Sequence, residues 1–192
     1  MDRAALAAAI ELGLLYGGWC PKGGWAEDFP NPPGLLAVYP HLRETPSDDP
    51  LQRTEWNVRD ADQLLILIDK RGLAISKGSM AARDFAVSLA KSHKVIDLHA
   101  PDAFAQALAF VGEAKLEAAL CIAGSRESEA PGIYAKARPF FVCGSRPIDA
   151  LTWRAADQLI LNRMWRLPAE MHAMHLVHPP KRIPPDEQSD DD

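Results

Sequence analysis

The sequence predicts an α/β protein with a Rossmann-like parallel sheet and helices on both of its faces. Short apolar runs alternate along the chain with helical patterns of roughly ten residues, the crossover arrangement that parallel strands need. The segment Gln63-Leu-Leu-Ile-Leu-Ile-Asp69 is apolar without alternation, which is typical of a strand buried on both faces. Two polar, glycine-bearing loops follow strands directly, and sheets of this class bind ligands at the carboxyl ends of their strands.

The first part of the chain predicts a helix, a short strand and a long loop. The helix spans residues 2–12 and ends at Gly13, a residue type that favours the left-handed conformation after a helix. The apolar stretch Leu14–Trp19 predicts a strand. Residues 20–50 are rich in proline and form a loop whose aromatic side chains favour order over disorder.

The following elements continue the alternation. We expect strands over 63–69, 94–98 and 118–123, and helices over 51–60, 80–92, 101–112 and from 133 onward. Residues 1–143 thus form one Rossmann-like ligand-binding domain. After it we expect a helical extension over 144–168 and a disordered tail over 169–192, first rich in proline and histidine and then acidic.

The two loops that follow buried strands are the candidate ligand site, because parallel strands bring both loops to one edge of the sheet. In the first loop, Ser76, Lys77, Gly78 and Ser79 could hold a phosphate at the start of a helix, or they could form an ordinary helix cap. In the second loop the candidates are Gly124, Arg126, Glu127 and Ser128. Arg126 could contact phosphate in a bidentate manner, or it could form a surface pair with a glutamate.

Two further candidates lie outside these loops. Lys22 belongs to the long loop, which could close over a ligand or could be a rigid cover over the core. Asn57 shares a helix face with Arg53 and Asp60, because residues three and four apart are neighbours on a helix. This face could contact a ligand or could form a structural network.

Composition argues against several classes of partner. The net charge of −5 comes from the acidic C-terminal end, and the rest of the chain has as many acidic as basic residues. We therefore expect no nucleic-acid partner, since a phosphate backbone needs a basic surplus. No apolar run approaches the roughly 20 residues of a membrane span. Three widely spaced cysteines suit the cytoplasm and form no zinc motif. His172, His175 and His178 could be a metal ligand set, but a tail seldom supplies the convergent geometry, so we expect no metal site.

Four ordered segments together resemble one family. They are Gly17-Gly-Trp-Cys-Pro-Lys-Gly23 with Ala26-Glu-Asp28, Tyr39-Pro40 with Arg43-Glu-Thr45, Arg53-Thr-Glu-Trp-Asn-Val-Arg-Asp60 with Asp62, and Ala123-Gly-Ser-Arg-Glu-Ser128 with Ala130-Pro-Gly-Ile133. Their content and order resemble the circularly permuted YpsA-like branch of the SLOG superfamily over residues 2–143. The resemblance implies a Rossmann-like fold, a homo-oligomer and a nucleotide-like ligand. For the carrier members of the family this ligand is the molybdenum cofactor, a phosphorylated pterin.

The chain departs from the family pattern at two places. The family opens with a strand and a Gly-Gly-Gln-Thr-Gly-x-Asp-Arg loop, of which this chain has Met1-Asp2-Arg3. We hypothesise that the true start lies upstream of Met1, and the resemblance implies that without that segment the sheet lacks its first strand and one phosphate loop. The second departure is Ser76-Lys-Gly-Ser79, where the family has Thr-Gly-Gly-Thr. Lysine restricts the backbone there and adds an ammonium group.

Three functions remain as hypotheses. A binding or carrier protein without chemistry of its own is favoured, because the sequence has no recognisable nucleophile–base pair. A nucleotide phosphoribohydrolase of the related lysine-decarboxylase-like branch is the enzymatic alternative. Glu127 would then be the catalyst, although the Pro-Gly-Gly-x-Gly-Thr-x-x-Glu loop of that branch has no counterpart here. The third hypothesis is a degenerate member that no longer binds ligand and serves as an oligomeric scaffold.

Overall fold

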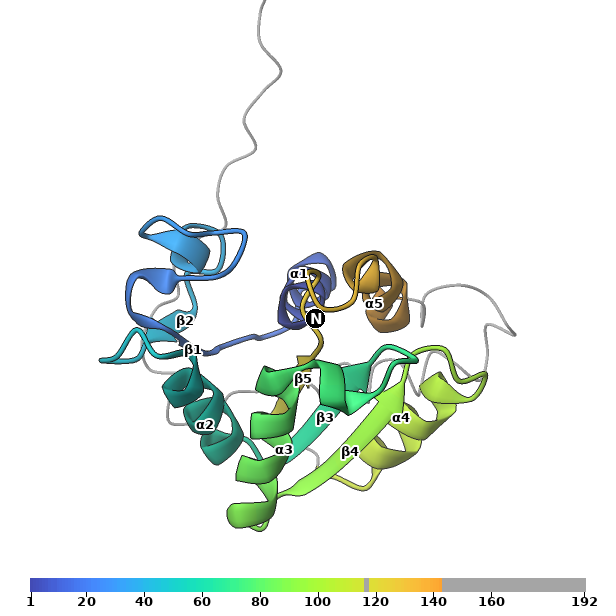
Figure 1. Ribbon diagram of the computed structural model, residues 1–192. Helices are drawn as coiled ribbons and strands as arrows, with labels where there is room; N and C mark the ends of the chain where they lie inside the picture. Colours follow the sequence, from blue (N-terminus) through green and yellow to red (C-terminus); the bar gives the residue numbers. More distant parts are fainter. Residues whose placement is uncertain (116–117, 143–192) are drawn as a thin grey trace, which may run out of the picture.

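The computed structural model describes residues 1–115 and 118–142, and it confirms the α/β class (Figure 1). The helices are α1 (Asp2–Glu11), α2 (Pro50–Asp60), α3 (Lys77–Ser88), α4 (Ala103–Gly112) and α5 (Ile133–Val142). The strands are β1 (Gly18–Cys20), β2 (Leu42–Glu44), β3 (Gln63–Ile68), β4 (Ser92–Asp97) and β5 (Leu120–Gly124). The expected helical extension and tail lie outside the described residues.

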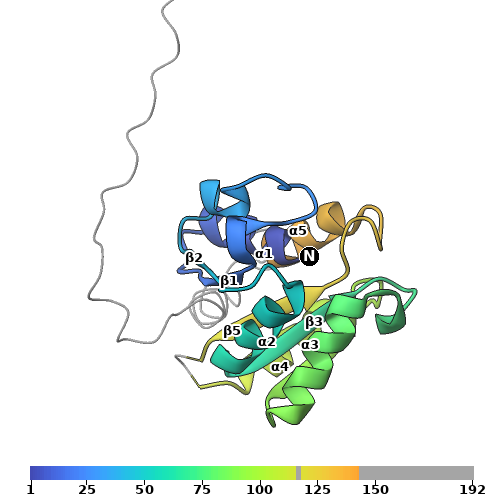
Figure 2. The same cartoon turned by 60° about the vertical axis from the view of Figure 1, so that its left-hand side comes forward.

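The larger sheet is parallel, with the strand order β4-β3-β5. Every residue of β3 is buried, as its unbroken apolar run predicts. Leu65 and Leu67 face a core formed with α1, α4 and α5, while Leu64, Ile66 and Ile68 face α2 and α3. Helices therefore cover both faces of this sheet, and α1 lies beside α5 in both views (Figures 1 and 2).

A second, smaller sheet consists of β1 and β2, which pair in parallel. The prediction of a strand over Leu14–Trp19 was only partly right, since the strand covers Gly18–Cys20. Strand β2 was missed, because three residues inside a proline-rich segment give no usable periodicity. Within the described residues β1 pairs only with β2, and β5 pairs only with β3, so the two sheets are not joined by hydrogen bonds.

Helix α3 begins at Lys77, three residues earlier than expected. Ser76 is its N-cap, and the Ser76 side-chain oxygen accepts a hydrogen bond from the Ser79 N–H at 3.3 Å. Sequence alone left Ser76 and Ser79 as alternative caps, because either hydroxyl suits that position. The consequence is that Lys77, Gly78 and Ser79 form the first turn of a helix that follows β3 after a connection containing a short 3-10 helix, Leu73–Ile75.

Candidate functional site

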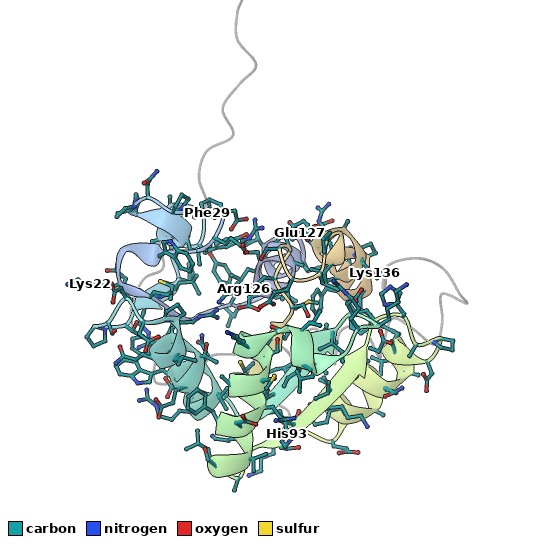
Figure 3. The ribbon with its side chains drawn as sticks, in the orientation of Figure 1. Lys22, Phe29, His93, Arg126, Glu127 and Lys136 are labelled. Atoms are coloured by element: carbon teal, nitrogen blue, oxygen red, sulfur yellow. The ribbon has the colours of Figure 1, made fainter. Side chains whose placement is uncertain are left out.

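A cavity of about 690 Å³ lies between β1 of the smaller sheet and β5 of the larger sheet, and residues that follow β5 are part of its wall. Its walls come from the start of α1, from β1, α2 and β5, from the first turn of α3, and from the long loop. Figure 3 shows Arg126 in the middle of the molecule, between the long loop that carries Lys22 and Phe29 and the larger sheet. This volume lies within the range of roughly 300–1,000 Å³ typical of small-molecule sites.

Most of the predicted site residues line this cavity. They are Asn57, Ser76, Gly78, Ser79, Gly124, Arg126, Glu127 and Ser128. Two do not reach its wall. Lys22 is exposed at the outer edge of the molecule (Figure 3), and the side chain of Lys77 is exposed on α3. The shared edge that parallel pairing predicts for the two loops is therefore present.

The N-terminus of α3 presents hydrogen-bond donors to the cavity. Ser76 and Ser79 are both buried, and the Ser79 hydroxyl donates to the Ser76 hydroxyl oxygen at 2.9 Å. Within the described residues, the backbone N–H groups of Lys77 and Gly78 have no acceptor. Free N–H groups and the positive end of the helix dipole together favour an anion at this position.

The loop after β5 uses its own carboxylates to hold its backbone. Glu129 accepts a hydrogen bond from the Arg126 N–H at 2.9 Å. Glu127 accepts from the N–H groups of Gly132 and Tyr134, at 2.5 and 3.0 Å, and so caps α5. These two backbone hydrogen bonds hold the pKa of Glu127 below its ordinary value. Glu127 is therefore ionised at neutral pH and engaged with its own helix.

Arg126 differs from the other described arginines of the cavity wall, because its guanidinium has no ion pair or ring contact among the described residues. The other arginines in the wall are engaged. Arg3 pairs with Asp28, Arg53 pairs with Asp2 at 2.9 Å, and Arg43 lies 4.3 Å from the centre of the Trp19 ring. Of the four described arginines that line the cavity, Arg126 is the one whose guanidinium has neither an ion pair nor a ring contact. A guanidinium without a partner in a cavity wall is suited to bind phosphate.

The long loop is held to α1 and to the loop after β5 through residues that line the cavity. Asp28 pairs with Arg3 of α1, whose guanidinium also lies 5.7 Å from the centre of the Phe29 ring. Glu27 accepts a hydrogen bond from the Ser128 hydroxyl at 2.9 Å. Sequence analysis named Arg3 only as part of the family's first motif, and the structure gives it this role in holding the loop.

Asn57 holds the backbone of β1. Its side-chain oxygen accepts from the Trp19 N–H at 2.7 Å, and its side-chain nitrogen donates to the Trp19 carbonyl at 3.0 Å. The Trp19 ring is fixed as well, by a 2.7 Å hydrogen bond to Asp60 and an edge contact with Trp56. Asn57 and Asp60 thus form a structural network on this helix face, and Asn57 also lines the cavity. Trp25 also lines the cavity and is 38% exposed, so its ring is accessible to a ligand.

Two thiols line the cavity, and both are protonated at neutral pH. Burial raises the pKa of Cys121 to about 12, and the nearby Asp2 carboxylate contributes. Burial also raises the pKa of Cys20, whose thiol donates to the Arg43 carbonyl. Neither is poised as a thiolate ligand. In the part of the chain that the structure describes, no cluster of histidine, cysteine and acidic residues could hold a metal ion, and no helix has the length and apolarity to cross a membrane.

Comparison with known proteins gives one family and one solved structure. The profile of the circularly permutated YpsA SLOG family matches residues 1–143. The crystal structure of a putative molybdenum carrier protein from Syntrophus aciditrophicus SB is similar to this chain, with a TM-score of 0.61 and 34% sequence identity. The match covers 72% of this chain and 84% of that one. No curated protein matches the chain.

Proposed function

The chain belongs to the circularly permutated YpsA SLOG family, and from this premise we propose that it binds a small phosphorylated, nucleotide-like molecule in the cavity between its two sheets. The favoured ligand is the molybdenum cofactor. The chain then acts as a carrier that holds this ligand without transforming it, in the cytoplasm and as a homo-oligomer.

One observation carries the proposal: two independent anion-binding features line the same cavity. The first turn of α3 offers the N–H groups of Lys77 and Gly78 beside the Ser76 cap. Arg126, which follows β5, offers a guanidinium that has no ion pair with any described residue. A phosphate between them would receive backbone hydrogen bonds, the helix dipole and a bidentate contact.

The rest of the cavity suits a flat ring attached to that phosphate. Trp25 provides an aromatic face at the cavity, and apolar side chains of β5 and α2 line the deeper wall. The name of the solved relative, at 34% identity, supports the molybdenum cofactor over other phosphorylated rings. We assign ligand contacts to Ser76, Gly78, Ser79, Arg126 and Ser128, and we assign Lys77 a contact through its backbone alone.

A carrier fits the site better than the phosphoribohydrolase alternative. A carboxylate that acts as a general acid needs a raised pKa, and the pKa of Glu127 is lowered by the backbone of α5. Its two oxygens are also occupied by Gly132 and Tyr134. We therefore assign Glu127 to positioning the loop that carries Arg126.

The test is native mass spectrometry of freshly purified protein, followed by addition of molybdenum cofactor to the apo form. We expect a bound mass that corresponds to a phosphorylated pterin, in a stoichiometric complex. Protein that carries no small molecule and takes up none of the added cofactor would overturn the carrier proposal and favour the scaffold hypothesis. Release of free base from nucleoside monophosphates would instead favour the enzyme.

A further inference from the structure

The two groups proposed to hold an anion come from different segments of the chain. Ser76, the cap of α3, ends the connection after β3, whereas Arg126 lies in the loop after β5. One anion can contact both only if the two loops keep a fixed separation, because a binding site must hold its groups within about 0.5 Å of the productive geometry. A contact that holds one loop against the other therefore contributes to binding.

Arg71 makes such a contact between the two loops. Its Nη2 donates a 2.6 Å hydrogen bond to the Glu129 carbonyl oxygen, which lies 58 positions further along the chain. Its Nε donates to Asp69 Oδ1 at 2.8 Å, and its backbone N–H donates to the same oxygen at 3.0 Å. Asp69 directly follows β3, so the guanidinium is anchored at the carboxyl end of that strand and reaches the loop after the neighbouring strand β5.

Glu129 connects this contact to Arg126. Its carbonyl accepts from Arg71, and its carboxylate accepts from the Arg126 N–H at 2.9 Å. The Ala130 N–H donates to the Arg126 carbonyl at 2.8 Å. The turn from Arg126 to Ala130 is thus held by two hydrogen bonds of its own, so a bond to Glu129 constrains the backbone that carries the Arg126 guanidinium.

Arg71 makes these contacts from outside the cavity. Neither Arg71 nor its partners Asp69 and Glu129 belong to the described residues that line it. The Arg71 side chain is 46% exposed. Its hydrogen bond to Asp69 holds the pKa of that carboxyl below its ordinary value, so Asp69 is ionised at neutral pH and can anchor the guanidinium. An exposed ion pair adds little stability by itself, so the consequence of this arrangement lies in the bond to the other loop.

We propose that Arg71 is a positioning residue for the anion site: its bond to Glu129 keeps Arg126 in place in the cavity wall. This role rests on the proposed function, because it requires an anion that Arg126 contacts. Without the bond the loop after β5 would sample other positions, and the apparent Kd would rise by the inverse of the fraction that stays competent to bind. A competent fraction of about one fifth would raise the Kd about fivefold.

The test is isothermal titration calorimetry with inorganic pyrophosphate, on single and double variants at fixed ionic strength. Arg71→Ala should raise the Kd about fivefold. Arg71→Lys should stay close to the alanine variant, because one ammonium lacks the fork of donors that reaches both Asp69 and Glu129. In a chain that already carries Arg126→Ala, adding Arg71→Ala should change the Kd by less than about twofold, since the group that Arg71 positions is gone.

A matched control and hydrogen exchange separate this role from a general loss of stability. Arg83 is 41% exposed and pairs with the adjacent Asp84, and Arg83→Ala should bind pyrophosphate like the parent. In the ligand-free Arg71→Ala variant the Arg126 amide should exchange faster than in the parent, while the amides of β3 should be unchanged. Saturating pyrophosphate should restore the protection of the Arg126 amide. Faster exchange throughout β3 would indicate global destabilisation and contradict the positioning role.

Three binding results would also overturn it. They are an unchanged Kd for Arg71→Ala, full recovery of affinity in Arg71→Lys, and an equal loss on removal of Arg71 with and without Arg126. The second would assign the effect to charge alone, and the third to a direct contact or to charge. A parent protein that binds no pyrophosphate would remove the proposed anion site and this role with it, whereas binding by the parent that Arg71→Ala leaves unaltered would remove only the role of Arg71.

Discussion

Replacing Arg126 with alanine removes the free guanidinium of the cavity, and its effect on anion binding can be estimated from the structure. A hydrogen bond to a charged group contributes about 1.5–3 kcal/mol, and each 1.4 kcal/mol corresponds to a factor of ten in Kd. The dissociation constant should therefore rise roughly 10- to 100-fold. Because Arg126 has no ion-pair partner within the described residues, the free energy of unfolding should change by less than about 0.5 kcal/mol.

The assay is isothermal titration calorimetry with inorganic pyrophosphate and with ADP, at fixed ionic strength. Arg126→Lys keeps the charge but loses the bidentate geometry, so it should fall between the parent and the alanine variant. Arg83→Ala is the control, because it removes the same charge from the outer face of α3, where Arg83 pairs with exposed Asp84. Its affinity should equal that of the parent.

Two results would refute the reasoning. If Arg126→Ala binds pyrophosphate within twofold of the parent, the guanidinium does not contact the anion. If Arg83→Ala weakens binding as much as Arg126→Ala, the effect reflects the net charge of the protein and not a specific contact.

Three further predictions concern the elements that shape the site. Ser76→Ala removes the cap of α3 and should lower the free energy of unfolding, measured by denaturant titration, by about 1 kcal/mol. Ser76→Thr should keep most of this stability. Equal stability of the parent and both variants would contradict the capping role. The lowered pKa of Glu127 stabilises the fold above its ordinary value of 4.5, and this contribution is lost as the pH falls through the lower folded-state pKa. Glu127→Gln should thus be less stable than the parent at pH 7, and the two should converge as the pH falls below the folded-state pKa of Glu127. A pH-independent difference would show that the charge is not the cause. A Cβ at Gly124 would lie 2.2 Å from the Leu67 carbonyl and 2.6 Å from the Met1 side chain, so Gly124→Ala should destabilise by about 1–3 kcal/mol. A Cβ at Gly112 would meet nothing within 4 Å, so Gly112→Ala should be neutral or slightly stabilising in thermal unfolding, the assay used for both variants. Similar losses of stability for both variants would contradict the steric argument.

Local patterns were sufficient to predict the fold class and the edge of the sheet where the two candidate loops lie. The unbroken apolar run of β3 predicts a central strand, and its burial on both faces follows from that composition. Strand–helix alternation predicts parallel pairing, and parallel pairing alone brings the Ser76 and Arg126 loops to one edge. The boundary of α3 was less certain, because two serines three residues apart can each cap a helix.

The sequence by itself therefore determined the sheet, its covering helices and the identity of the two loops, because these depend on periodicity and on neighbours close in the chain. Only the tertiary structure decided which charged and polar side chains form ion pairs or hydrogen bonds with one another. Asn57 reaches Trp19 across 38 positions, and Asp2 reaches Arg53 across 51, so no local pattern could reveal that Arg126 would be left without a partner. The separation of β1 from β5 is likewise a property of long-range packing, since strand order depends on contacts between segments far apart in the chain.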